Sequence, residues 1–294
     1  MSHHLQPIMH RVCGWFFAAC IAAAPRSLPA QRTLTDVAYV TSGETAQRLD
    51  LYLPEGQGFP TLVMVHGGGL TQEDKRDDSL PAICTTVARA GMGCASVNYR
   101  LGPAALWPAQ PEDVAAAVAW LRHHIAQYGG DSTLLVIMGH SSGCLLASVI
   151  GTDSRYLAAQ QLGLAALRGV VAMGCTLSPV MPAISDSARL RAVFTHGALL
   201  TFGSLEAFLE ANPTAHAGPQ TPPFLVLIAE AEQVNPPILE RARPFEAKMH
   251  TVGRPVEVDV LPDRRHYTAL TSMANATDPT LKLLLDFIRR STGR

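Results

Sequence analysis

The sequence has few charged residues and no long apolar run. Of its 294 residues, 16% are charged, and the formal net charge is −1. Binding to nucleic acid requires a basic face that neutralises phosphates, so this balance argues against nucleic acid as a partner. No stretch approaches the ~20 consecutive apolar residues of a transmembrane helix. Because 48% of the residues are apolar, the chain still has ample material for a core.

Cysteine is also scarce, with six in the chain. No C-x-x-C or H-E-x-x-H spacing occurs, so we predict no metal site, and nothing in the sequence calls for a cofactor. Four cysteines lie beyond residue 30. We interpret Cys144, at the start of a helix, and Cys175, at the end of a strand, as small apolar packing residues. The spacing of Cys84 and Cys94 leaves open whether they form a disulfide.

The first 30 residues have the pattern of a leader. Arg11 precedes a mostly apolar run at residues 12–24, which ends in three alanines. This is typical of a secretory signal peptide, and we expect a periplasmic or secreted protein. Residues 17–20 also loosely resemble a bacterial lipoprotein box, which would make Cys20 a lipid anchor. An uncleaved N-terminal arm is the remaining alternative.

Strand and helix patterns alternate along the rest of the chain. Residues 61–65 are continuously apolar, as in a strand buried on both faces of a parallel sheet. Residues 111–125 have one apolar stripe at helical spacing and end at two glycines. The expected strands span residues 34–40, 48–53, 61–65, 93–99, 136–139, 168–173, 224–229 and 256–261. The expected helices include residues 80–90, 111–128, 237–249 and 279–290.

This alternation predicts an α/β fold, with a mostly parallel central sheet and helices on both faces. We expect one domain over residues 31–294. Residues 176–221 break the rhythm, with four prolines and a short helical stretch at residues 205–210. Irregular segments of this length are often functional, so we interpret it as a small cap over the site.

A serine near the middle of the chain has the surroundings of a nucleophile. An apolar strand pattern runs into G-H-S-S-G at residues 139–143, and small residues compatible with a helix follow. This turn is so tight that Cβ atoms at its two glycine positions would clash. It exposes the Ser141 hydroxyl and leaves the Ser142 N–H facing the atom attacked. We predict Ser141 as nucleophile, and we interpret His140 as a packing residue that points away from the reaction.

A serine hydroxyl needs a base to remove its proton, and the base needs a carboxylate to fix its tautomer. His266 follows the last predicted strand and fits the base. The strand at residues 224–229 leads into a loop with two glutamates. We predict Glu232 as the acid because it lies deeper in that loop. Glu230 and Asp263 remain as alternatives.

Acyl transfer also requires N–H donors for the negative charge on the former carbonyl oxygen. Residues 66–69 read H-G-G-G directly after a buried strand, and glycine lets the backbone approach closely with its N–H groups exposed. We predict an oxyanion hole made by Gly68, Gly69 and Ser142.

These motifs together resemble the α/β-hydrolase superfamily, in its branch of carboxylesterases, hormone-sensitive-lipase-like esterases, feruloyl esterases and kynurenine formamidases. Four stretches carry the resemblance: His66-Gly-Gly-Gly69, Asn98-Tyr-Arg-Leu101, Trp107-Pro-Ala-Gln110 with Glu112-Asp113 and Trp120-Leu121, and Tyr128-Gly-Gly-Asp131 before the elbow.

The resemblance implies the roles predicted above, and structural positions for Arg100 and Asp113. The chain departs from the family at two points. The acid, usually Asp, is here Glu232. Cys144 follows Gly143 where a second glycine is common.

We therefore expect a serine hydrolase that cleaves carboxylic esters through an acyl-enzyme intermediate. An amidase or formamidase of the same fold is the alternative, and a non-catalytic binding module is a further one. The expected partner is a small-molecule ester with an apolar part, because the cap segment holds large apolar side chains, which could equally form the core of the cap. These are Leu177, Val180, Met181, Phe194, Leu199, Leu200 and Phe202.

Overall fold

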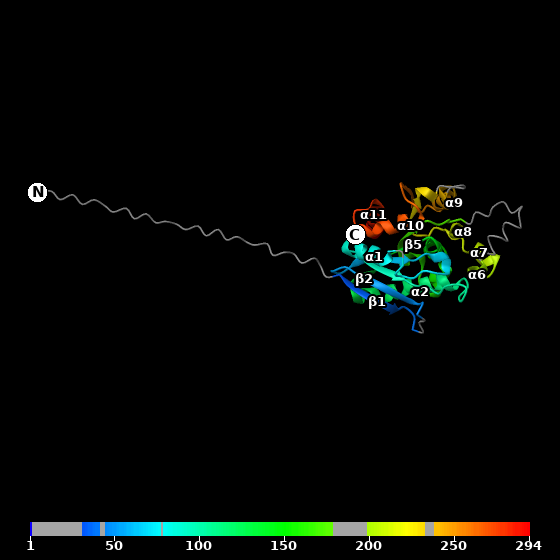
Figure 1. The fold of residues 1–294 in the computed structure, drawn as a ribbon, viewed down its shortest axis with the longest axis horizontal. Coiled ribbons are helices and arrows are strands. Elements are labelled where there is room, and N and C mark those ends of the chain that lie inside the picture. The colour runs from blue at the N-terminus through cyan, green and yellow to red at the C-terminus, as the bar shows by residue number, and fades with distance from the viewer. Residues whose placement is uncertain (2–30, 42–44, 78, 179–198, 233–237) are drawn as a thin grey trace.

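The computed structural model describes residues 1, 31–41, 45–77, 79–178, 199–232 and 238–294 (Figure 1). Apart from residue 1, the expected leader, with its candidate lipid anchor Cys20, lies outside the described residues. So does the middle of the expected cap, at residues 179–198.

The fold is built on an eight-stranded sheet in the order β1-β2-β4-β3-β5-β6-β7-β8. β2 pairs antiparallel with both of its neighbours, and the strands from β4 to β8 are parallel. The strands are β1 (Arg32–Ala38), β2 (Arg48–Leu53), β3 (Phe59–Val65), β4 (Gly93–Val97), β5 (Gly130–His140), β6 (Leu167–Met173), β7 (Phe224–Ala229) and β8 (Val256–Leu261).

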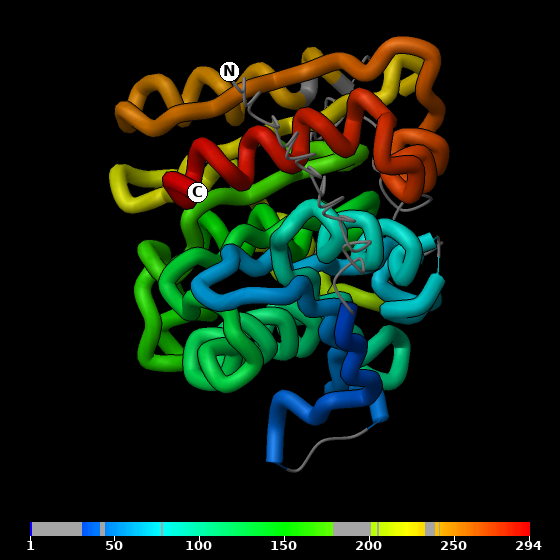
Figure 2. The backbone as a smooth tube through the Cα atoms, turned by 90° about the vertical axis from the view of Figure 1, so that its left-hand side faces the viewer, coloured from blue at the N-terminus to red at the C-terminus, as the bar shows by residue number. Residues whose placement is uncertain are grey.

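Helices cover both faces of this sheet. α1 (Leu80–Arg89), α10 (His266–Thr271) and α11 (Pro279–Thr292) bury their apolar residues on one face; α1 in cyan and α11 in red can be followed in Figure 2. α2 (Ala109–His124), α3 (Ser142–Thr152) and α9 (Ile238–Thr251) bury theirs on the other. The predicted α/β fold with a mostly parallel sheet is therefore confirmed.

Shorter helices complete the described part of the chain. They are α4 (Ser154–Ala159), α6 (Leu199–Phe202), α7 (Leu205–Glu210), α8 (Pro213–His216), η1 (Gly68–Leu70), η2 (Ile125–Tyr128), η3 (Leu164–Ala166), η5 (Glu230–Glu232) and η6 (Ser272–Ala274). None of the helices in the described ranges is both long and apolar enough to cross a bilayer.

Continuous apolar runs became the central strands, as their composition predicts. All seven residues of β3 and all six of β7 are buried, because helices pack on both faces of them. The edge strands β1 and β8 are only partly buried. α2 begins two residues before the predicted Pro111, since proline is tolerated anywhere in a first turn whose N–H groups have no helical partner.

The described part of the expected cap packs onto the main core. The Trp107 N–H donates to the Thr201 carbonyl oxygen at 2.7 Å, and the rings of Trp107 and Phe202 lie 5.0 Å apart. Leu177 and Phe202 are buried in the same core cluster as α2 and α3. These two residues therefore contribute to the main core, rather than to a separate core of the cap.

The structure corrects our interpretation of Cys144 and Cys175 as packing residues. Cys144 and Cys175 form a disulfide, rather than only packing as small apolar residues, and Cys84 pairs with Cys94. The distant pair forms because β5 and β6 are parallel neighbours. Cys144 starts the helix after β5 and Cys175 lies two residues beyond the end of β6, so parallel pairing brings them together.

Candidate active site

The elbow at the end of β5 has the steric requirement that its glycines predict. A Cβ built on Gly139 would lie 1.9 Å from the Gly143 carbonyl oxygen, and one on Gly143 would lie 2.3 Å from the carbonyl oxygens of Val65 and His66. Ser141 itself adopts φ 55°, ψ −123° at the start of α3. Such strain persists only where the surrounding structure enforces it. Here the Ser141 N–H donates to Met173 of the neighbouring strand at 3.0 Å.

Glu232 and His266 meet directly at the same edge of the sheet. Glu232 Oε1 lies 2.5 Å from His266 Nδ1, and Glu232 Oε2 accepts the Ala229 N–H at 3.0 Å. The Glu232 side chain is 10% exposed and that of His266 is 34% exposed. A carboxylate has no hydrogen to donate, so in this bond the imidazole must be the donor. In the neutral imidazole the proton is therefore on Nδ1, and Nε2 is left as an acceptor.

The Glu230 carboxylate and the Asp263 backbone hold two loops together instead. Glu230 Oε2 accepts the Asp263 N–H at 2.9 Å, and the Ala231 N–H donates to the Arg264 carbonyl oxygen at 3.0 Å. Asp263 is exposed, in the left-handed region at φ 56°. These bonds fix the loop after β7 against the loop after β8, which sets the separation between the carboxylate and the imidazole.

His140 contacts the candidate base, which the sequence did not suggest. Its Nε2 donates to the His266 carbonyl oxygen at 3.0 Å, and the two rings lie 4.5 Å apart. Because His140 precedes Ser141, this contact ties the residue beside the nucleophile to the backbone of the histidine. The side chain packs, as expected, but against the site rather than away from it.

The loop after β3, at residues 66–70, also contacts the elbow. Gly68 and Gly69 both have positive φ, at 83° and 64°. The Leu70 N–H donates to Ser142 Oγ at 3.2 Å, so the Ser142 side chain fastens this loop to the elbow. The buried Tyr99 hydroxyl lies 2.9 Å from the Gly67 carbonyl oxygen and 3.0 Å from that of His66, and donates to them.

Burial keeps this loop electrically neutral. The His66 ring is 1% exposed and stacks on the Tyr99 ring, with centroids 4.2 Å apart. Desolvation lowers the pKa of His66 to about 4, so the imidazole is uncharged near neutral pH. Burial likewise raises the pKa of Tyr99 and preserves its hydroxyl as a donor.

An ion cluster anchors the segment that follows the loop. Lys75 is 2% exposed, and its Nζ lies 2.7 Å from Asp36 and 3.3 Å from the fully buried Asp50. Arg76 pairs with the same two carboxylates. Hydrogen bonds from Lys75 and Arg76 lower the pKa of Asp36 to about 2. The side-chain amide of Asn98 adds a clamp, because its Oδ1 accepts the Lys75 N–H at 2.6 Å.

The Cys144–Cys175 disulfide lies next to the acid–base pair. Cys175 follows Gly174, which has φ 70°. A Cβ on Gly174 would lie 3.2 Å from His266 Nδ1 and 3.4 Å from Glu232 Oε1. The glycine therefore forms the floor under the imidazole–carboxylate bond, and the disulfide attaches that floor to α3.

The structural positions implied for Arg100 and Asp113 are confirmed. Arg100 Nε and Nη2 each bind one oxygen of the buried Asp113 at 2.8 Å. Across the described ranges, we find no group of His, Cys, Asp and Glu side chains that could hold a metal ion.

Several known proteins are similar to this chain in sequence or in fold. The BD-FAE family model matches residues 49–165. Esterase LipQ of Mycobacterium tuberculosis is 28% identical, over 79% of this chain and 56% of the relative. LipM of the same organism, described as a probable carboxylic ester hydrolase, is 27% identical over 74% of this chain and 51% of the relative. The chain thus spans about half the length of these relatives.

Solved structures share the fold. EstE1, a thermostable carboxylesterase cloned from a metagenomic library, superposes with a TM-score of 0.68 and 20% identity, over 92% of each chain. The chain has the α/β-hydrolase fold. The resemblance inferred from the motifs is confirmed, and the elbow strand, the H-G-G-G loop and Tyr99 lie within the residues that the family model matches.

Sequence reasoning assigned no role to several side chains of this site. Tyr99 and the Ser142 hydroxyl hold the H-G-G-G loop in place, and Asn98 clamps the segment that follows the loop. Two signals were available for Asn98 and Tyr99, because they belong to one of the stretches that carry the resemblance and directly follow a buried strand at the carboxyl edge of the sheet.

Proposed function

We propose that this protein cleaves carboxylic esters with Ser141 as nucleophile, His266 as base and Glu232 as acid. The observation that carries the proposal is the 2.5 Å contact between Glu232 Oε1 and His266 Nδ1. It leaves Nε2 able to take a proton at the edge of the sheet where the elbow lies. The esterase names of LipQ and LipM support the choice of reaction.

In the proposed mechanism, Ser141 Oγ attacks the ester carbonyl carbon while His266 Nε2 takes the hydroxyl proton. Glu232 keeps the imidazole in the required tautomer and stabilises the imidazolium. The N–H groups of Gly68, Gly69 and Ser142 stabilise the oxyanion, each worth about 3–4 kcal/mol in comparable sites. The intermediate collapses when His266 passes the proton to the leaving alcohol. Water then attacks the acyl-enzyme by the same steps.

The same machinery would cleave an amide or a formamide, so the substrate decides between the two reactions. We propose an ester because the relatives are named for ester hydrolysis. The test is a panel of p-nitrophenyl esters from acetate to palmitate, run beside N-formylkynurenine. Turnover of N-formylkynurenine alone would assign the formamidase instead.

A fluorophosphonate probe distinguishes a catalyst from a binding module. We expect one adduct, on Ser141, and we expect Ser141→Ala to abolish both labelling and hydrolysis while the melting temperature stays within a few degrees. Ser141 is only partly buried and alanine meets the same backbone strain, so stability should not depend on the hydroxyl. An unlabelled wild-type protein would reject the proposal.

We also propose that the protein is exported. The two disulfides support this, because disulfides persist mainly in oxidising compartments. Mass spectrometry of the secreted or periplasmic protein should find a new N-terminus between about residues 22 and 31. A lipid-modified Cys20 would instead establish an anchored form, and an intact Met1 in the cytoplasm would reject export.

A further inference from the structure

A pocket of about 580 Å³ lies at the edge of the sheet where the parallel strands begin. Its walls come from the start of β6, from the segments that precede β6, β7 and β8, and from the end of α11. The candidate active site lies where the same strands end. β6 has seven residues. At about 3.3 Å per residue, roughly 20 Å separates the pocket from the elbow, so the pocket is no part of the candidate active site.

Two arginines line this pocket, and backbone carbonyl groups hold both of them in the same way. Arg168 Nε donates to the Thr133 carbonyl oxygen at 2.9 Å, and Arg254 Nε donates to that of Thr221 at 2.5 Å. Arginine has five N–H donors, so four remain on the Nη1 and Nη2 groups of each side chain. No described residue forms a hydrogen bond or an ion pair with those groups. The anchored Nε restrains a long side chain in advance, which reduces the entropy lost when a ligand binds.

The carboxylates near this edge are engaged elsewhere. Glu257, on β8, pairs with Arg290 at 2.6 Å. Asp131 accepts two hydrogen bonds from Thr133, which lower the pKa of its carboxyl, and two arginines outside the pocket lower it further. None of the described residues that line the pocket is acidic. The positive charges of its two arginines are therefore not neutralised within the pocket.

The rest of the wall is mostly apolar. Leu164, Leu167 and Pro222 are buried, and Gln220 and Ser291 add neutral polar groups. A cavity of this size accommodates a small organic molecule. Guanidinium groups bind carboxylate, sulfate or phosphate oxygens through charge-assisted hydrogen bonds, which are about twice as strong as neutral ones. The lining therefore combines a site for an anionic group with a surface for an apolar one.

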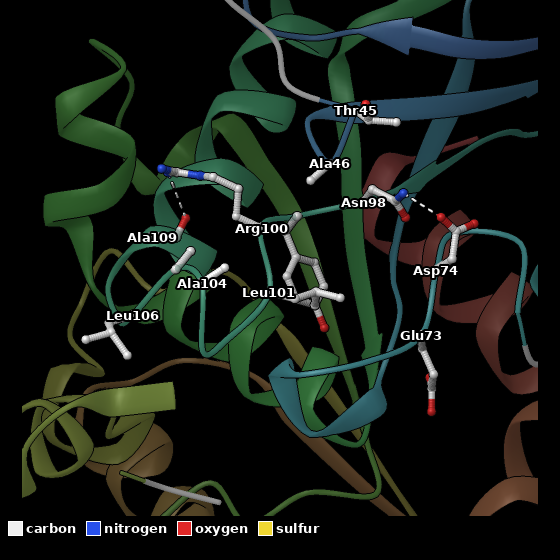
Figure 3. Close-up of a pocket in the computed structure, with 12 residues that line it drawn as sticks. Thr45, Ala46, Glu73, Asp74, Asn98, Arg100, Leu101, Ala104, Leu106 and Ala109 are labelled. Atoms are coloured by element: carbon white, nitrogen blue, oxygen red, sulfur yellow. Dashed lines mark hydrogen bonds between the residues drawn. The ribbon is translucent and has the colours of Figure 1, made fainter. Parts of the chain in front are cut away.

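The larger pocket beside the candidate active site differs in this respect (Figure 3). It also contains an arginine, Arg100, but Nε and Nη2 of this residue bind both oxygens of the buried Asp113. Figure 3 shows the same guanidinium directed toward the Ala109 carbonyl oxygen. Arg100 thus stabilises the fold through a buried carboxylate, whereas Arg168 and Arg254 have no carboxylate partner among the described residues.

We propose that the pocket at the start of β6 binds a small organic anion, one that carries a carboxylate, sulfate or phosphate group on an apolar body. The anionic group binds to Arg168 and Arg254, and the apolar body contacts Leu164, Leu167 and Pro222. This second site does not depend on the proposed ester hydrolysis, because none of these residues belongs to the candidate triad.

The test is an NMR titration with probes of related shape. Benzoate, benzenesulfonate and phenyl phosphate are the anions, benzyl alcohol is a neutral counterpart, and inorganic phosphate lacks the apolar body. Arg168→Gln and Arg254→Gln each remove one charge. Ala165→Glu keeps both arginines and adds a competing carboxylate at an exposed position of the wall, with Ala165→Gln as its neutral control. Arg32→Gln is the matched control for the arginines, since Arg32 is exposed at the same edge and donates to a backbone carbonyl outside the pocket.

We expect the anions to shift the backbone amide signals of residues 163–168 and 220–221, with a Kd on the order of 1 mM for molecules of this size. Each arginine variant should weaken the binding of phenyl phosphate about 10-fold, and Ala165→Glu should do the same. Ala165→Gln and Arg32→Gln should change the Kd by less than about threefold. Benzyl alcohol and inorganic phosphate should both bind more weakly than phenyl phosphate. The anion that binds most tightly identifies the preferred group.

Signals that shift at the elbow, and not at this pocket, would overturn the inference, since they would place the anion at the candidate active site. An equal loss of affinity in Arg32→Gln would also overturn it, because the attraction would then belong to the whole edge. So would binding of benzyl alcohol or of inorganic phosphate as tight as that of phenyl phosphate. These variants leave the candidate triad intact, so the inference and the proposed function fail separately.

Discussion

Replacing Glu232 by glutamine separates the role of its charge from that of its shape. Both carboxylate oxygens are engaged, Oε1 by His266 Nδ1 at 2.5 Å and Oε2 by the Ala229 N–H at 3.0 Å. Glutamine has one oxygen and one NH₂ group for the same two positions. Its amide oxygen can therefore accept from only one of the two donors.

The two orientations of that amide set the expected loss. With its oxygen on the Ala229 N–H, its NH₂ faces Nδ1, and the imidazole must carry its proton on Nε2, where it cannot act as base. With its oxygen on Nδ1, two donors face each other at Ala229, at a cost of about 1–3 kcal/mol. The active orientation is then about 5- to 150-fold less populated. The neutral amide also stabilises the imidazolium less, and the equivalent change in serine proteases costs about 10⁴-fold in kcat. We expect a loss of about 10²–10⁴-fold.

The assay is the pH dependence of kcat and kcat/KM on a soluble ester, with thermal unfolding to show that the fold persists. Glu230→Gln is the matched control, because a glutamine oxygen can still accept the Asp263 N–H. Asp263→Asn is the second control, since Asn tolerates the left-handed backbone there. Both should change the rate by less than about tenfold. If either control proves crippled while Glu232→Gln stays active, our assignment of the acid is wrong.

Two further predictions concern stability. The pKa of His66 is about 4 when folded and about 6.5 when unfolded, so the unfolded state takes up the proton first as the pH falls. This proton uptake should lower the free energy of unfolding by about 3 kcal/mol between pH 7 and pH 4. Urea titrations should show a smaller loss for His66→Gln, and an equal loss in the variant would refute the lowered pKa of His66. Replacing Cys144 and Cys175 by serine should cost roughly 4 kcal/mol, against roughly 3 kcal/mol for Cys84 and Cys94, whose separation along the chain is 10 residues rather than 31. Only the replacement of Cys144 and Cys175 should also lower kcat, because this disulfide lies next to Glu232 and His266. Equal activity of the two double variants would contradict that supporting role.

The central strands and the elbow could be predicted because their signals are local. A continuous apolar run such as Phe59–Val65 has few alternatives to a buried strand, and Gly139 is required by a backbone contact with Gly143, four residues away. The preference for Glu232 over Glu230 depended on depth in a loop, and the structure places Glu232 on the His266 ring.

Other features depend on which strands become neighbours. Cys144 and Cys175 are separated by 31 residues, and only the parallel pairing of β5 with β6 brings them together. The left-handed backbone of Glu73 had no signal, since nothing in a glutamate favours positive φ. The Asn98 clamp lies just beyond β4 and the ion-pair partners of Lys75 lie in β1 and β2, so local sequence could not reveal the conformation.

The ion cluster behind the H-G-G-G loop has a consequence for how the molecule unfolds locally. β1 and β2 form one edge of the sheet, and an edge hairpin would ordinarily fray at little cost. Here its detachment would remove Asp36 and Asp50 from Lys75, which is 2% exposed, and leave a buried ammonium without its carboxylates. The hairpin and the loop that carries Gly68 and Gly69 should therefore unfold as one cooperative unit. The backbone amides of β1 should exchange with solvent as slowly as those of the loop segment around Lys75, although β1 is the most exposed edge of the sheet.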